Sequence, residues 1–365
     1  MGLRVLITNI GLWPPSGTPV YVRDLALELH RLGHTPIVFS STAGGIAEAL
    51  RRAGIEVTDK LDRVRETPDI IHGHHHAPTT VALRHWPSVP AIYVCHDHTS
   101  PYDRTPIHHN IRRYFGVSRL CVQRVVREGV PEDGVELLLN FVDAARFTPR
   151  IPLPVRPHRA LVFSNYAHAG SHLPAVTEAC RQAGLELDVA GVAAGKLILE
   201  PELLLSNYDI VFAKGKAAME AMAVGSAVIL CDSSGVGPMV TSARFDELRP
   251  LNFGFEALCD PLEPEILLRE IARYDPDDAA RVQDLVRSRA GLVPAVERLV
   301  AIYDEVIAKQ PQGLSHRRPK RRPYRSTLYL RLYWRWTSVS PELREKLKRL
   351  SIVQITARGV RRILR

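Results

Sequence analysis

The stretch AKGKAAMEAMAVGSAVILCD contains a single carboxylate, Glu220, among small and apolar residues. The pattern YDIVFA just before it (208–213) predicts a strand, and Gly215 allows a tight turn into a helix that begins near Lys216. The free N–H groups and positive dipole end of such a helix attract anions, and Lys214 and Lys216 add positive charge there. Glu220 lies one helical turn further on, where its carboxylate can accept hydrogen bonds from two hydroxyls.

A diphosphate at this turn and a ribose on this acid together describe a nucleotide. We therefore expect a nucleotide site built from Lys214, Gly215, Lys216 and Glu220. The alternative is a solvated acid on an exposed helix face. The alanines and methionines on both sides of Glu220 favour the nucleotide, because they are typical of a covered helix.

Gly17 lies in the loop GLWPPSGTPV, between a predicted strand (3–8) and a predicted helix. There it can let the backbone approach a phosphate, although an ordinary turn explains a lone glycine as well.

His96 ends a predicted buried strand (91–95) beside Asp97 and His98. Such a histidine can serve a reacting centre, or it can be a hydrogen-bonded core residue.

Nine of the 15 histidines fall between residues 72 and 109. Clustered imidazoles suggest zinc, but neither HExxH nor CxxC spacing accompanies them, so we predict no metal site. An acceptor cleft rich in hydrogen-bond donors is the preferred interpretation, with His74 as its candidate acceptor-binding residue.

Short apolar runs that alternate with helical patterns predict parallel sheets with crossover helices. The strands expected in the first half are 3–8, 35–40, 69–72, 91–95, 113–117 and 135–139. The alternation restarts after a proline-rich connector, TPRIPLPVRPHR, with strands expected at 160–164, 185–190, 208–213 and 226–231. We expect an α/β protein with two doubly wound domains, 1–148 and 149–310, and ligands at the carboxyl ends of their strands.

Residues 311–365 contain 16 Lys/Arg and 2 Asp/Glu, a net charge of +14, whereas the rest of the chain carries −5. This segment also has Trp334 and Trp336 among arginines, followed by an amphipathic helical pattern. Basic charge with interfacial aromatic residues favours an anionic membrane surface as its partner. A disordered solvated tail is the alternative, and nucleic acid is a weaker third.

The 365 residues hold no apolar run long enough to span a membrane, and the N-terminus lacks the pattern of a signal peptide. The five cysteines are odd in number, far apart and without CxxC spacing, which is typical of reduced thiols. We expect a cytoplasmic protein that is peripheral on the inner face of the cell membrane.

MEAMAVGSAVILCDSSGVGP resembles the donor-site segment of the GT-B glycosyltransferases, especially glycosyltransferase family 4. GTPVYVRDLALELHRLGHTPIVFSS, PDIIHGHH, AIYVCHDH, FGVSR and LLLNFVDAARFTP resemble further landmarks of that family, in the same order. Each piece is short, but their collinearity over about 1 to 310 is specific. The resemblance implies two Rossmann-like domains facing a cleft, an N-terminal acceptor domain and a C-terminal donor domain.

The resemblance also implies retaining transfer of a hexose or related sugar from a nucleotide-sugar co-substrate, with no cofactor or metal. The acceptor would be a glycan or a lipid-linked glycan of cell-envelope polysaccharide biosynthesis. Gly17 would approach the donor phosphate, Glu220 would hold the ribose, and His96 would face the donor sugar and the reacting centre. The protein would act mainly by positioning the reactants and stabilising the departing diphosphate.

The sequence departs from the family pattern at two donor-site positions. Phe212 stands where the family usually carries a first glutamate, and FSNYAHAG replaces a Gly-Arg…Lys pair that binds diphosphate. Asn165, within that segment, and the two lysines at the turn before Glu220 are candidates to bind the donor instead. Two alternatives therefore remain: a non-catalytic GT-B-like protein that binds a nucleotide or glycan and is recruited by its tail, and a nucleotide-sugar epimerase.

Overall fold

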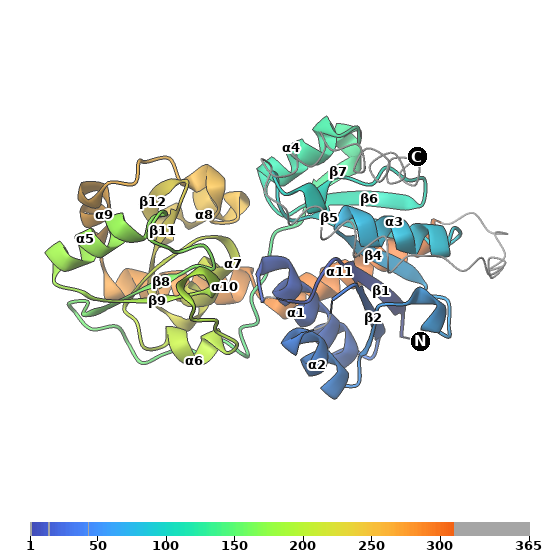
Figure 1. Cartoon of the computed structure of the whole chain (residues 1–365), viewed down its shortest axis with the longest axis horizontal. Coiled ribbons are helices and arrows are strands. Elements are labelled where there is room, and N and C mark those ends of the chain that lie inside the picture. Colours follow the sequence, from blue (N-terminus) through green and yellow to red (C-terminus); the bar gives the residue numbers. More distant parts are fainter. Residues whose placement is uncertain (1, 14, 43, 310–365) are drawn as a thin grey trace, which may run out of the picture.

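The computed structural model describes residues 2–13, 15–42 and 44–309, which form two α/β domains side by side (Figure 1). The first domain is a seven-stranded parallel sheet in the order β3-β2-β1-β4-β5-β6-β7. Its strands are β1 (Arg4–Asn9), β2 (Thr35–Ser40), β3 (Glu56–Thr58), β4 (Ile70–His74), β5 (Ala91–Cys95), β6 (Ile111–Gly116) and β7 (Val135–Leu137). Its helices are α1 (Gly17–Arg31), α2 (Gly45–Arg52), α3 (His76–His85) and α4 (Arg119–Arg127).

The second domain is a five-stranded sheet in the order β12-β11-β10-β8-β9, parallel except for β12. Its strands are β8 (Arg159–Phe163), β9 (Glu186–Ala190), β10 (Ile210–Ala213), β11 (Ala227–Asp232) and β12 (Gly235–Met239). Its helices are α5 (Leu173–Ala183), α6 (Pro201–Leu205), α7 (Gly215–Val224), α8 (Phe245–Leu248), α9 (Pro264–Ile271) and α10 (Pro276–Arg289). The predicted fold class, two doubly wound domains, is confirmed. The predicted basic tail, 311–365, lies outside the described residues.

Continuous apolar runs produce the central strands of both sheets. All residues of β5 and β11 are buried, as expected for strands that helices cover on both faces. Helix α7 ends at Gly225, whose positive φ of 104° provides the left-handed residue that commonly stops a helix. Residues that follow β5, β8 and β10 lie between the two domains, where they line the cavities described below.

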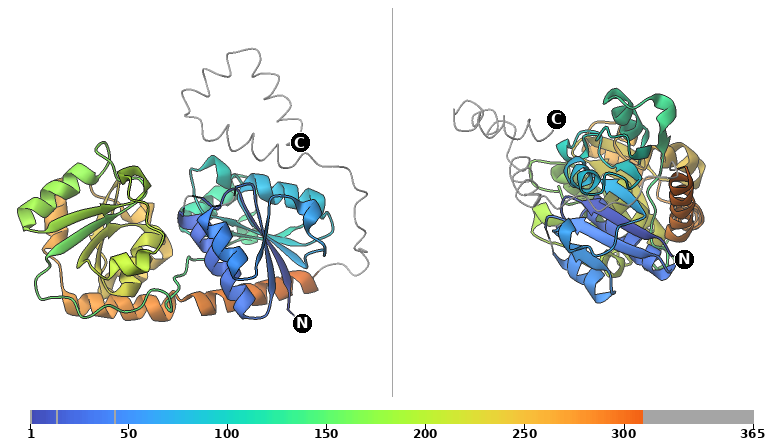
Figure 2. Two further views of the ribbon diagram at one scale, coloured as in Figure 1. Left: turned by 60° about the horizontal axis from the view of Figure 1, so that its bottom comes forward. Right: turned by 90° about the vertical axis from the view of Figure 1, so that its right-hand side faces the viewer.

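The last described helix, α11 (Leu292–Ala308), lies under the first domain (Figure 2). Its apolar face, which includes Val296, Leu299 and Tyr303, belongs to the hydrophobic core of the first sheet. The predicted division of the chain places these residues in the second domain, whereas their side chains pack in the first. The chain thus passes between the domains twice, once after β7 and once before α11. A β-bridge between Val142 and Gly291 joins the two crossing segments.

None of the helices in residues 2–13, 15–42 and 44–309 combines the length and the apolar character of a membrane-spanning segment.

Candidate functional site

Two cavities lie between the domains, where the strand ends of both sheets meet. The first cavity is lined by Gly17, Asn165, Lys214, Lys216 and Glu220, together with Arg23, Arg146 and other residues. The second cavity is lined by Gly17, His96, Lys214, Gly215 and Lys216, together with the segment 251–256 except Phe253. The structure therefore brings every predicted site residue except His74 to the walls of these two cavities.

The Lys214–Gly215–Lys216 turn begins α7 as the sequence predicts. Gly215 has a positive φ of 58°, which a residue with a side chain rarely adopts. Its N–H donates to the carbonyl of Phe253 at 2.8 Å, so this backbone group already has a partner. The next N–H groups of the first turn are those that a helix leaves without an internal acceptor. They are the part of the turn that can bind an anion.

Lys214 reaches across the end of the second sheet. Its Nζ lies 2.8 Å from Oδ2 of Asp232 and 3.4 Å from the centre of the Phe255 ring. Hydrogen bonding and attraction from Lys214 help to hold the pKa of the Asp232 carboxyl below its usual value, against the opposing effect of burial. Both lysines line both cavities, but the Lys214 side chain is 22% exposed and that of Lys216 only 7%, so Lys214 is the better placed to meet a phosphate.

Lys216 instead connects the two domains. Its Nζ lies 3.0 Å from Oδ2 of Asp24 on α1 and donates to the carbonyl of Phe141 at 3.1 Å. Asp24 is buried, and attraction to Lys216 and Arg23 outweighs burial and keeps the pKa of its carboxyl below its usual value. The charge of Lys216 is thus already compensated by a carboxylate of the first domain. A phosphate would share or replace that partner.

Glu220 is buried on the inner face of α7, 3.9 Å from Lys216 between Oε1 and Nζ. Burial raises the pKa of its carboxyl to about 7, an effect that Lys216 opposes and Asp24 reinforces. A covered acid at a cavity wall is what a ribose-binding carboxylate requires. A solvated acid on an exposed helix face is ruled out by its burial.

Gly17 and Asn165 also line the first cavity, one from each domain. Gly17 is the first residue of α1, and a side chain added there would meet nothing within 4 Å, so its backbone faces open space. Asn165 accepts a hydrogen bond from the N–H of Val192 and donates one to the carbonyl of Pro15, at 3.2 Å and 3.1 Å. Asn165 is therefore a second direct link between the domains.

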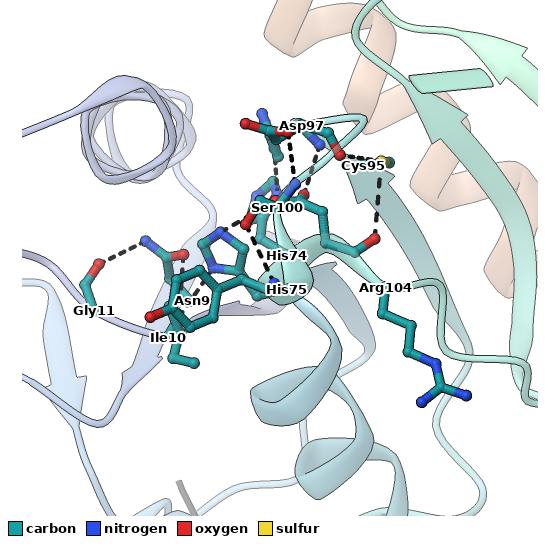
Figure 3. A network of polar contacts seen from close by, with 12 residues as sticks. Asn9, Ile10, Gly11, His74, His75, Cys95, Asp97, Ser100 and Arg104 are labelled. Atoms are coloured by element: carbon teal, nitrogen blue, oxygen red, sulfur yellow. Dashed lines mark hydrogen bonds and ion pairs between the residues drawn. The ribbon is translucent and has the colours of Figure 1, made fainter. Parts of the chain in front are cut away.

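His96 follows β5 and lines the second cavity. Its Nε2 lies 2.8 Å from Nδ1 of His74, and its backbone N–H donates to Oδ1 of Asp103 at 2.8 Å. Figure 3 shows the polar network at these strand ends, in which His74, His75 and Asp97 come together. The sequence predicts that His74 binds the acceptor, but its side chain is fully buried next to His96 and cannot contact an acceptor in this conformation.

The buried histidines continue into the core of the first domain. His72, two residues before His74 on β4, has its Nδ1 2.5 Å from the hydroxyl of Tyr303 on α11. Burial lowers the pKa of His72 to about 3 and that of His74 well below its usual value. Both rings are therefore neutral. Among the described residues, no group of three or more histidine, cysteine or carboxylate side chains is arranged to hold a metal ion.

Several cavity residues were missed from the sequence. Arg23 lies on α1 within an ordinary helical pattern, and Arg146 lies just before the proline-rich connector, paired with Glu202. Asp24, the partner of Lys216, was missed as well. Segment 251–256 carries no motif, and it reaches the second cavity only through the tertiary fold.

Comparisons with known proteins agree with this architecture. Residues 15–146 match a family model described as Glycosyltransferase Family 4. A glycosyltransferase from Rickettsia africae ESF-5 has a TM-score of 0.58 and 15% sequence identity, over 84% of this chain and 99% of that chain. HepE of Anabaena, solved with UDP and glucose, has a TM-score of 0.59 and 14% identity, over 83% and 100%. No curated protein matches the sequence.

A protein described as a UDP-N-acetylglucosamine 2-epimerase from Listeria monocytogenes has a TM-score of 0.52 and 14% identity, over 86% of this chain and 98% of that chain. At such low identities these likenesses establish a shared two-domain fold. They leave the chemistry to be argued from the side chains of the cavities.

Proposed function

From the premise that the chain is a GT-B protein similar to glycosyltransferase family 4, we propose that it transfers a sugar from a nucleotide-sugar donor to a glycan or lipid-linked acceptor. One observation carries this proposal. A single cavity is lined by the N-terminus of α1 from the first domain and by the N-terminus of α7 from the second. The buried carboxylate of Glu220, one turn along α7, lines it as well. Two helix N-termini suit a diphosphate, and the carboxylate suits a ribose.

In this proposal Lys214 and the first turn of α7 bind the diphosphate. Lys216 stays paired with Asp24 and contacts the diphosphate only if that ion pair is shared or broken. Gly17 lets the backbone of α1 approach the same phosphates, and Asn165 closes the cavity from the second domain. HepE of Anabaena was solved with UDP and glucose, which makes UDP-glucose the first donor to test. The nucleotide sugar is a co-substrate, and the proposal includes no cofactor and no metal.

His96 is proposed to face the reacting centre, since it lines the second cavity and two hydrogen bonds fix its position. We infer retaining transfer, in which the donor phosphate takes the acceptor proton and the protein mainly positions the reactants. The hexosyl character of the donor and a role in cell-envelope polysaccharide synthesis belong to the same proposal. So does a cytoplasmic location with peripheral attachment through 311–365.

The first experiment is a thermal-shift screen of the full chain against a panel of nucleotide sugars and nucleoside diphosphates. A ligand present at 100 times its Kd stabilises the folded state by about 2.7 kcal/mol, which raises Tm by several degrees. Any hit is then incubated with candidate acceptors, and release of the nucleoside diphosphate is measured. Absence of a shift with every nucleotide would contradict the proposal.

A non-catalytic nucleotide- or glycan-binding protein is the second candidate. It is favoured by Phe212, a buried apolar residue at the place where family 4 usually has a carboxylate, and by the pairing of Lys216 with Asp24. Turnover separates the two candidates: a binding protein would show the thermal shift without releasing nucleoside diphosphate. An epimerase would convert the nucleotide sugar without an acceptor, which analysis of the recovered donor would reveal.

A further inference from the structure

A second histidine ring holds the ring of His96 from inside the first domain. Nε2 of His96 lies 2.8 Å from Nδ1 of His74, which is fully buried at the end of β4. The ring of Tyr21, on α1, packs edge-on against both imidazoles, with centroid distances of 4.9 Å to His96 and 5.3 Å to His74. Because Nε2 of His96 is directed at His74, Nδ1 is the ring nitrogen that remains available to the second cavity.

The proton in this hydrogen bond can belong to either ring. A neutral imidazole has one N–H donor and one acceptor nitrogen, and the hydrogen bond that one nitrogen makes determines the role of the other. Burial first, and the neighbouring imidazoles second, lower the pKa of both His74 and His96 well below the usual value. Both rings are therefore neutral, and each carries a single ring proton.

The surroundings of His74 favour one of the two arrangements. Nε2 of His74 is buried and has no hydrogen-bond partner. A proton there would leave a buried N–H group without an acceptor, which native structures avoid more strictly than an acceptor without a donor. The proton of His74 is therefore assigned to Nδ1, which donates it to Nε2 of His96. Since Nε2 of His96 then accepts, the proton of His96 belongs on Nδ1, the nitrogen available to the second cavity.

We propose that His74 is a positioning residue, which fixes the tautomer and the direction of the His96 ring so that an Nδ1–H group faces the second cavity. This inference rests on the proposed function, in which His96 faces the reacting centre. In that role a neutral ring with a proton on Nδ1 donates a hydrogen bond to a ligand oxygen and cannot act as a base through this nitrogen. This agrees with a transfer in which the donor phosphate takes the acceptor proton.

The backbone of His96 has a separate support. Its N–H donates to Oδ1 of Asp103 at 2.8 Å, and Asp103 is itself buried. Arg124 holds the loop that follows, because its Nη1 donates to the carbonyl of Asp97 at 2.8 Å. Loss of the His74 ring should therefore release the ring of His96 without displacing its backbone. The role of His74 in positioning can thus be measured apart from its role in folding.

The direct test is the tautomer of His96, measured by nuclear magnetic resonance on the full chain with isotopically labelled histidine. The signals of His96, identified by their loss in His96→Gln, should show a protonated Nδ1 and an unprotonated Nε2. A proton on Nε2 instead would overturn the proposal, whatever the substrate of the protein. In His74→Leu we expect both tautomers of His96 to appear, because no partner then selects one of them. A single unchanged tautomer in this variant would show that His74 does not select it.

Kinetics on the donor found by screening test the consequence for transfer. His74→Leu should lower kcat about tenfold or more and leave KM for the donor close to the wild-type value, because a group directed at the reacting centre is lost while binding is kept. His74→Asn should recover most of this loss, since its amide can donate from near the position of Nδ1. The matched control is His72→Leu, the same substitution on β4 in an equally buried ring, whose partner is the hydroxyl of Tyr303.

The control variant should lower Tm, as His74→Leu does, and keep kcat near the wild-type value. Equal falls in kcat for His72→Leu and His74→Leu would refute the positioning role, and so would a changed tautomer of His96 with kcat unchanged. If no nucleotide sugar is turned over by the wild-type protein, the proposed function fails. The tautomer measurement then still decides whether His74 fixes the ring of His96.

Discussion

Glu220 should make donor binding depend on pH near neutrality. Burial raises the pKa of its carboxyl to about 7, and only the ionised form can accept hydrogen bonds with both oxygens. The ionised fraction then rises about tenfold between pH 6 and pH 8, so the affinity for a nucleoside diphosphate should rise by the same factor. Titration calorimetry over this range measures it. Glu220→Gln should bind more weakly and without the slope, and a flat wild-type profile would remove Glu220 from the ribose site.

The same carboxyl should lower stability as the pH rises. Because its folded pKa lies above the unfolded value of 4.5, the folded chain keeps a proton that the unfolded chain loses between about pH 4.5 and 7. The free energy of unfolding should therefore fall through this window, by about 3 kcal/mol from this group. We expect Glu220→Gln to match wild type near pH 4.5 and to exceed it at pH 8. Urea unfolding at both pH values would show whether the difference grows as stated.

His96 is expected to serve transfer more than folding. His96→Ala removes a hydrogen bond to buried His74, which costs about 1 kcal/mol, whereas loss of a group at the reacting centre typically lowers kcat by about 100-fold or more. The measurements are Tm and kcat on the donor found by screening. A large fall in Tm with kcat preserved would show instead that His96 is a core histidine.

At the scale of elements, the two lysines of the α7 turn should behave differently. Lys216→Ala removes the partner of Oδ2 of buried Asp24, which then keeps only Arg23, and should lower the free energy of unfolding by about 3 kcal/mol. Lys214→Ala should cost about 1 kcal/mol and weaken diphosphate binding about tenfold, because its side chain is part-exposed at both cavities. Denaturant unfolding and titration of UDP distinguish them. If Lys214→Ala lowered stability more and Lys216→Ala weakened UDP binding more, Lys216 would be the phosphate-binding lysine and Lys214 the structural one.

Elements with strong local signals were predictable from the sequence. The long apolar runs of β5 and β11 and the glycine turn before α7 appear where their patterns indicate. Short β3 and antiparallel β12, which contains Gly235, Gly237 and a proline, carry little strand pattern and were missed. The burial of His74 was also missed. Alternation along β4 predicts that His72 and His74 share one face of the sheet, but it does not reveal that α1 and α11 cover this face.

For the whole molecule, α11 should be indispensable although it follows the second domain in sequence. Its apolar face, including Leu299 and Tyr303, fills the core of the first domain. A chain ending at residue 309 should keep the Tm of the first domain, whereas one ending at 290 should lose cooperative unfolding of that domain. Circular dichroism melts of both chains, with near-UV signals for tertiary packing, provide the comparison. Equal melts would mean that the helix adds nothing to the first core.

Residues 311–365 are proposed to bind an anionic membrane surface. At about 1 kcal/mol per basic residue near an anionic leaflet, a fraction of the 16 Lys/Arg suffices for reversible binding. The full chain should pellet with anionic vesicles at low salt and less so at high salt, because the attraction is screened over roughly 8–10 Å. A chain ending at 309 should stay in the supernatant. If both chains pelleted equally, the membrane contact would belong to residues 1–309, and the proposal for 311–365 would be wrong.

The return of the chain to the first domain has a mechanical consequence. Because α11 ends at Ala308 against the first sheet, any attachment made beyond it pulls directly on the domain that carries His96. The second domain, with α7 and Glu220, is connected covalently through the two segments that meet at Val142 and Gly291, and otherwise through side-chain contacts such as the Lys216–Asp24 pair. If residues 311–365 bind a membrane as proposed, the first domain would be the part held in place, and the second domain would be the part that moves when the space between them opens.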